Sequence, residues 1–131
     1  MKYTFTAVFT PKEDKSGYLC RVPDLPGCIS SGSTLEEAIH KITDAASVWL
    51  VDAEEDGEAV ALPTPQDMII RDPEDTVSVI LIDTIAYRAA TDTRAVRKNV
   101  SLPAWMANLA DKKGINCSQV LQEGLLAKFG A

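Results

Sequence analysis

Strict alternation of apolar and polar side chains opens the chain. In "KYTFTAVFTP", Tyr3, Phe5, Ala7 and Phe9 alternate with two threonines and a valine. Because successive side chains of a strand point to opposite faces, this pattern predicts a strand with one packed face. The turn "KEDKSG" joins it to a second strand, "YLCRVP", as an antiparallel hairpin. A short third strand is expected around residues 28–30, inside a segment rich in Pro, Gly and Ser.

A long amphipathic helix follows this segment. Thr34 can cap its start, and Glu37, three residues on, completes a capping box; Ser33 with Glu36 is the alternative shifted by one residue. Apolar residues then recur every three or four positions, which predicts one apolar face up to about Ala53. They are Leu35, Ala38, Ile39, Ile42, Ala45, Ala46 and Trp49.

The remainder of the first two thirds predicts a proline-rich segment and one more strand. "ALPTPQDMIIRDPED" favours an extended path over the surface. "TVSVILIDT" is a continuous apolar run, which predicts a central strand covered on both faces. Residues 1–84 therefore predict an α+β layer with the helix on one face, and residues 85–95 a linker.

The end of the chain has a different pattern. "RKNVSLP" alternates, so that Lys98, Val100 and Leu102 share one face of a strand and Arg97, Asn99 and Ser101 the other. A helix is expected over 103–113, ended by Gly114, and a second after it with an N-cap. That cap is Asn116, with Gln119 as its capping-box partner.

This C-terminal unit of about 35 residues has too little core to fold alone. If two copies pair their strands antiparallel, they form a two-stranded ribbon over four helices, which fits the major groove of DNA. One ribbon face would then read base edges, and the N-terminus of the last helix would hold a phosphate. The candidate DNA-binding residues are Arg97, Lys98, Asn99, Ser101, Asn116, Cys117 and Ser118. The pattern resembles the ribbon-helix-helix family of DNA-binding proteins over residues 96–130.

Charge separates the two parts. Among the 131 residues, positions 94–131 hold six basic and two acidic side chains, a net charge of +4. Positions 1–93 hold seven basic and seventeen acidic side chains, a net charge of −10. Such asymmetry suggests two different partners, a basic protein for the acidic part and phosphates for the basic part.

The remaining chemistry is sparse. Cys20, Cys28 and Cys117 lack the CxxC spacing of a zinc site, and the single histidine, His40, cannot build a metal site alone. We expect no metal, no cofactor and no catalytic residue. No secretory core or membrane-spanning apolar run is evident, which favours the cytoplasm.

Two segments resemble the HicB antitoxin family: "VPDLPGCISSGSTLEEAIHKITDAASVWL" with the later "LPTPQD", and "YRAATDTRAVRKNVSLP", which is similar to the linker and ribbon of its ribbon-helix-helix subgroup. The resemblance implies a partial RNase H-like body that neutralises a HicA-like, mRNA-cleaving toxin. It also implies autorepression of the operon through a C-terminal module at 96–131. The module would form a homodimer, and a tetramer would result if the bodies also associate. Candidate toxin contacts are Asp24, Glu36, Glu37 and Asp44, because they are acidic and lie in the first of these two segments.

Two other functions remain open at this point. One is a stand-alone ribbon-helix-helix regulator whose body senses a ligand. The other is a degenerate RNase H-like nuclease, in which Asp24, Asp44 and Asp83 would hold metal ions.

Overall fold

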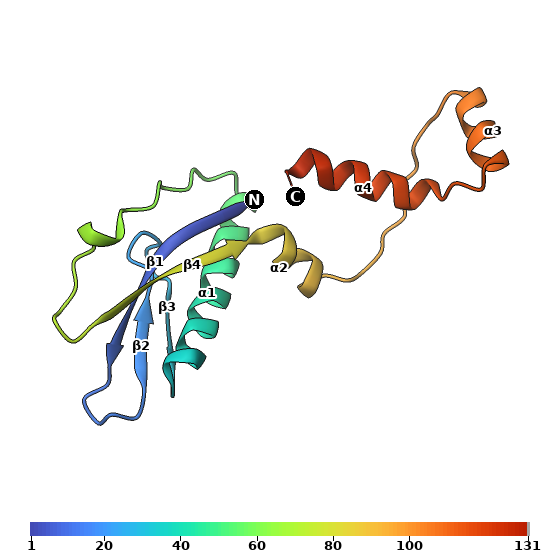
Figure 1. Ribbon diagram of the computed structural model, residues 1–131. Helices are drawn as coiled ribbons and strands as arrows, with labels where there is room; N and C mark the ends of the chain where they lie inside the picture. Colours follow the sequence, from blue (N-terminus) through green and yellow to red (C-terminus); the bar gives the residue numbers. More distant parts are fainter. Residues whose placement is uncertain (131) are drawn as a thin grey trace. The chain divides into compact units, whose positions relative to one another are not determined.

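The computed structural model describes residues 1–130 and divides the chain into two compact units (Figure 1). The first, here called the body, is Lys2–Ala90. The second, here called the tail, runs from Thr91 onward and is grouped with Met1. Each unit is described by itself.

The body is a four-stranded antiparallel sheet with one long helix on it (Figure 1). The strands are β1 (Lys2–Pro11), β2 (Tyr18–Arg21), β3 (Ile29–Gly32) and β4 (Thr76–Asp83), in the order β3-β2-β1-β4. The predicted hairpin is confirmed: β1 pairs with β2 antiparallel, and β2 with β3. The structure is therefore α+β, as the sequence pattern indicates.

Helix α1 (Leu35–Glu55) begins as its capping sequence predicts. The Thr34 hydroxyl accepts a hydrogen bond from the Glu37 amide at 3.1 Å. The Glu37 carboxylate reaches back one residue further than expected and accepts from the amide and hydroxyl of Ser33, at 3.3 and 2.5 Å. The bond from the Glu37 amide satisfies one of the donors that the first helical turn leaves without a partner, and the bonds from Ser33 fix the residue before the cap.

The core lies between α1 and the sheet. Phe5, Ala7 and Phe9 of β1 are buried there, as the alternation predicts. The expectation of a single packed face is wrong, because Thr6 and Val8 on the opposite face of β1 are buried too. Gly32 shows how closely the layers approach, because a Cβ built on it would lie 2.4 Å from the backbone nitrogen of Ala38. Only glycine fits at this contact between β3 and α1.

The proline-rich segment crosses the other face of the sheet. Val8 points away from α1 but is still buried. Its cross-strand neighbour Arg21 donates from Nη2 to the carbonyl oxygen of Ile70 at 3.3 Å, and the adjacent Ile69 is buried. The segment is extended, as the prolines predict, apart from the 3-10 turn η1 (Gln66–Met68) and a turn at residues 73–74.

The prediction that "TVSVILIDT" is a central strand is wrong. Within the body β4 pairs only with β1 and lies at the edge of the sheet. Ile80 and Ile82 face the core, whereas Val79 and Leu81 on the other face are exposed. A continuous apolar run indicates two faces that avoid water, but it does not reveal what covers the second face.

The expected linker also contains a helix, α2 (Thr84–Thr91). The Asp83 carboxylate accepts from the Ala86 amide at 3.0 Å and so satisfies an amide in its first turn. The sequence pattern does not predict this helix, because "AYRAAT" lacks a clear apolar stripe.

The tail contains α3 (Ala104–Lys112) and α4 (Cys117–Phe129). Asn116 caps α4 as predicted, since its side-chain oxygen accepts from the Gln119 amide at 3.1 Å. Gly114 ends the preceding turn with a φ of 64°. The expected strand over 97–103 has no regular structure in this single chain, because a strand needs a neighbour for its backbone hydrogen bonds.

Among residues 1–130, no helix is both long and apolar enough to span a bilayer.

Candidate functional site

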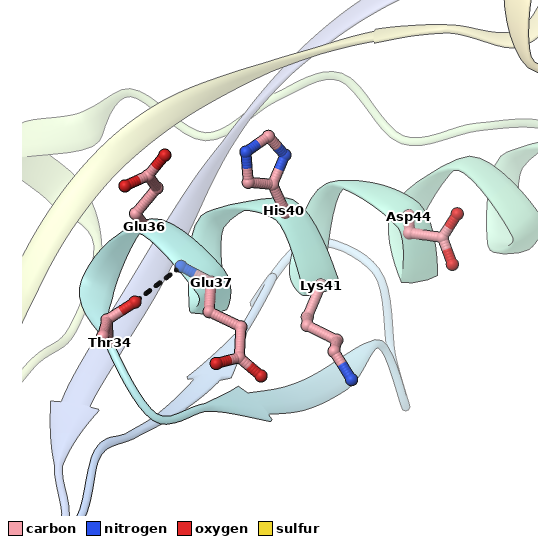
Figure 2. Close-up of a pocket in the computed structure, with 6 residues that line it drawn as sticks. All are labelled: Thr34, Glu36, Glu37, His40, Lys41 and Asp44. Atoms are coloured by element: carbon pink, nitrogen blue, oxygen red, sulfur yellow. Dashed lines mark hydrogen bonds between the residues drawn. The ribbon is translucent and has the colours of Figure 1, made fainter.

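The exposed face of α1 carries one group of candidate residues. Glu36, His40 and Asp44 recur every fourth position, and all three are exposed. Figure 2 shows Glu36 and His40 on the same side of the helix, with Glu37 and Lys41 extending to another side. The hollow that they line is open to solvent, so a macromolecular surface fits it better than an enclosed small molecule.

The acidic residues of this face differ in availability. Glu37 is used for capping, and hydrogen bonds from the Ser33 side chain and then the Ser33 amide lower the pKa of its carboxyl. Glu36 and Asp44 have no hydrogen bond or ion pair within the described part of the chain. These two carboxylates are therefore free to meet a cation on a partner.

Asp24 has a structural role. Its carboxylate accepts from the backbone amide of Thr64 at 2.8 Å and from the Thr64 hydroxyl at 2.6 Å. The turn that contains it is fixed from the other side as well, since Trp49 Nε1 donates to the carbonyl oxygen of Pro26 at 2.9 Å. The "PDLPGC" turn thus joins α1 to the proline-rich segment, and Asp24 has little capacity left for a partner.

The three aspartates proposed for metal binding perform separate tasks. Asp24 holds Thr64, Asp83 caps α2, and Asp44 lies exposed on α1. Across residues 1–130, no group of three or more His, Cys, Asp or Glu side chains could hold a metal ion. The geometry therefore gives no support to two-metal chemistry.

A polar cluster around Glu54 was not anticipated from the sequence. Glu54 Oε2 accepts from the Tyr3 hydroxyl at 2.8 Å and from the Thr84 hydroxyl at 3.0 Å. Glu54 Oε1 accepts from Arg88 at 3.2 Å, and the same guanidinium donates to Glu55 at 2.5 Å. The cluster ties β1, the end of α1 and the start of α2 together, so it fixes where the chain leaves the sheet.

The pKa values of this cluster reflect its bonds. Partial burial raises the pKa of Glu54, but the hydrogen bonds from Tyr3, Thr84 and Arg88 together outweigh burial and lower it. Burial, followed by the bond to Glu54, raises the pKa of Tyr3 to about 12. Glu54 is therefore held ionised and Tyr3 neutral.

The tail exposes its candidate DNA-binding groups. Arg97, Lys98, Asn99 and Ser101 are all exposed in the extended segment before α3. At the start of α4, the amides of Cys117 and Ser118 have no acceptor within residues 1–130. Free amides at a helix N-terminus can bind a phosphate.

The tail also leaves its apolar side chains exposed. None of its described residues is buried. The exposed large apolar residues that would form a core are Val100, Leu102, Trp105, Met106, Leu109, Ile115, Val120, Leu121, Leu125, Leu126 and Phe129. So much apolar surface in one short segment is typical of an interface.

Comparison with known proteins gives consistent results. A family model described as "HicB-like antitoxin of bacterial toxin-antitoxin system" matches residues 5–130. An uncharacterized 14.9 kDa protein from the rep-hol intergenic region of Haemophilus phage HP1 is 31% identical over 99 residues, which cover 73% of this chain and 71% of that protein.

Solved structures share the fold. The N-terminal domain of the Burkholderia pseudomallei antitoxin HicB is 25% identical with a TM-score of 0.51, covering 62% of this chain and 99% of that one. A chain of a toxin–antitoxin complex from Streptococcus pneumoniae has a TM-score of 0.59 at 18% identity, covering 98% of this chain and 99% of that one.

The α+β fold of the body is thus that of the N-terminal domain of a bacterial antitoxin. The chain belongs to the HicB-like antitoxin family. Antitoxins of this family are not enzymes, which removes the nuclease alternative.

Proposed function

We propose that this antitoxin neutralises a HicA-like, mRNA-cleaving toxin through its body and represses its own operon through its tail. The observation that carries the proposal is the separation of charge between two compact units. Lys2–Ala90 contains seven basic and sixteen acidic side chains, whereas the residues from Thr91 onward contain six basic and three acidic ones. Opposite charges on separate units favour two partners of opposite charge.

The toxin surface is assigned to the exposed face of α1. An enzyme that cleaves mRNA needs a basic surface for phosphates, and that surface is complementary to an acidic helix face. Glu36 and Asp44 are the available carboxylates of the four candidates, since Asp24 and Glu37 are engaged within the chain. A bound antitoxin would then cover the basic surface of the toxin that the RNA needs.

The tail is assigned to a ribbon-helix-helix homodimer. Two copies that pair residues 97–103 antiparallel would supply the missing strand neighbour and bury the exposed apolar side chains. Arg97, Asn99 and Ser101 would then face the bases, with Lys98 and the α4 N-terminus, Asn116, Cys117 and Ser118, near the backbone. A two-fold dimer reads a two-fold operator, so we expect an inverted repeat.

In this proposal the chain works in three segments: residues 1–84 bind the toxin and have a partial RNase H-like fold, residues 85–95 form the link, and residues 96–131 form the DNA-binding module. The antitoxin would act in the cytoplasm, where both mRNA and operator are found.

The toxin assignment is tested with a double variant, Glu36→Gln/Asp44→Asn. Removing two carboxylates from a charge-complementary interface should weaken toxin binding about tenfold or more, mainly through slower association. The measurement is surface plasmon resonance with the purified toxin partner at two salt concentrations. A matched control is Glu13→Gln, an exposed acid in the β1–β2 turn, which should bind as the wild type does. If both variants lost the same affinity for the toxin, net charge alone would explain the effect and the assignment to α1 would be wrong.

A further inference from the structure

His40 lies in the middle of the α1 face that is assigned to the toxin. It is the single histidine of the chain, and its side chain is exposed. Within residues 1–130 it has no hydrogen bond or ion pair, so nothing in the fold requires an imidazole at this position. Glu36 precedes it by four residues and Asp44 follows it by four, which makes each of them its neighbour on the helix surface.

The charges around His40 all come from α1. The hollow that contains it is lined by side chains of the helix and its N-cap: Thr34, Glu36, Glu37, His40, Lys41 and Asp44 (Figure 2). Three of these are acidic and one is basic, so the net charge of the hollow is −2 when His40 is neutral and −1 when it is protonated. Carboxylates and lysine amines ordinarily titrate outside the range of about pH 5–8, whereas histidine titrates inside it. One proton therefore halves the charge that the hollow offers to a basic partner.

We propose that His40 is a proton-sensitive switch for toxin binding, which permits the complex when it is neutral and weakens it when it is protonated. This inference rests on the proposed contact of the toxin with Glu36 and Asp44. A helix rises about 1.5 Å per residue, so these two residues lie about 12 Å apart along the helix axis, with His40 about 6 Å from each. A cation of the toxin on either carboxylate thus lies near the imidazole ring. A neutral ring tolerates such a neighbour, whereas an imidazolium repels it.

The direction of the effect follows from the charges. Because the complex with neutral His40 is the tighter one, affinity is highest above the range in which histidine titrates and falls as the pH decreases through it. Two repulsions over about 6 Å, screened by water, correspond to a loss of affinity on the order of tenfold for the fully protonated state. Acidification would therefore loosen the complex through this one side chain.

The test compares the pH dependence of toxin binding by the full-length wild type and by His40→Gln. Surface plasmon resonance with the purified toxin partner would run from about pH 8 to about pH 5.5 at constant ionic strength. Over this interval we expect the wild type to lose about fivefold more affinity than His40→Gln, since protonation is still incomplete at the acidic end. The toxin is the same in both series, so its own titrating groups cancel in the ratio of the two dissociation constants. Parallel profiles would overturn the switch.

Two further variants separate the charge of His40 from its shape and from the total charge of the helix. His40→Lys stays positively charged throughout and should bind the toxin several-fold more weakly than His40→Gln, even at about pH 8. Lys41→Gln is the matched control, because it removes a charge from the same hollow but keeps the titrating group, so it should show the wild-type pH profile. If Lys41→Gln flattened the profile as much as His40→Gln does, total charge would explain the effect and the role of His40 would be wrong.

Failure of the toxin assignment itself would look different. If Glu36→Gln/Asp44→Asn bound the toxin as tightly as the wild type, α1 would not be the contact surface, and the switch would fail with it. If that double variant weakened binding while the profiles of the wild type and His40→Gln stayed parallel, only the switch would be wrong. Circular dichroism at both ends of the pH range shows whether each variant keeps its helices, so that unfolding is not mistaken for a lost contact.

Discussion

Glu54 shows how one residue organises the exit of the chain from the body. It lies in the last turn of α1 and joins Tyr3 of β1 to Thr84 and Arg88 of α2. Bonds to a charged acceptor in a partly buried site contribute more than the exposed ion pair between Arg88 and Glu55. Nothing in the sequence pattern distinguishes Glu54 from its acidic neighbours, because its partners lie 51, 30 and 34 residues away.

Glu54→Gln should lower the free energy of unfolding by about 1–3 kcal/mol at neutral pH, because hydrogen bonds to the ionised carboxylate weaken. The pKa of Glu54 is lowered in the fold, so its contribution is complete above the unfolded pKa of about 4.3 and is lost as the pH falls through the lower folded value. Urea unfolding at pH 7, 5 and 3 should therefore show a deficit that is constant from pH 7 to 5 and shrinks below pH 4.

The control for this effect is Glu55→Gln, which removes the more exposed partner of Arg88 and should cost less than about 1 kcal/mol. The role given to Glu54 would be contradicted if Glu55→Gln lowered the free energy of unfolding as much as Glu54→Gln does. It would also be contradicted if the loss caused by Glu54→Gln grew as the pH falls.

At the scale of elements, local sequence signals predict the structure correctly, whereas the apolar run of β4 does not predict its position in the sheet. Alternation predicts β1, and Thr34 and Asn116 predict the starts of α1 and α4, because these features depend on residues within one turn or strand. The position of β4 depends on which strands pair with it, and its apolar run contains no information about that. The structural role of Asp24 likewise depends on a distant residue, because its hydrogen-bond partner Thr64 lies 40 residues away in the sequence.

The segment before α3 is the element whose structure depends most on a second copy. Leu102→Asp would place a charge on the inward face of the proposed ribbon and should cost at least about 2 kcal/mol of tail dimerisation, since an unpaired charge would be buried. Sedimentation should show a smaller assembly for the Leu102→Asp variant than for the wild type. Ser101→Asp, on the adjacent outward position, should keep the wild-type mass but lose DNA binding through repulsion of phosphates. Unchanged mass with Leu102→Asp would contradict the ribbon dimer.

At the scale of the whole molecule, the proposed function assigns the toxin and the operator to two different compact units. The acidic face of α1 offers carboxylates to the proposed toxin, and the basic tail offers cations and exposed apolar residues to the proposed operator and second copy. Separate surfaces allow a variant to lose one function and retain the others. Toxin neutralisation should thus survive changes that abolish operator binding.

Operator binding tests the central claim most directly. Fluorescence anisotropy would compare full-length wild type, Asn99→Ala and Lys98→Ala on DNA from upstream of the gene and on scrambled DNA, at two salt concentrations. We predict sequence-dependent binding by the wild type and a loss of about 1–3 kcal/mol with relaxed base preference in Asn99→Ala. Lys98→Ala should weaken binding to both DNAs by the same factor. It should also reduce the slope of the log binding constant against log salt concentration by about one. Equal wild-type binding to both DNAs would contradict autorepression through the tail, as would joint loss of toxin and operator binding in Asn99→Ala.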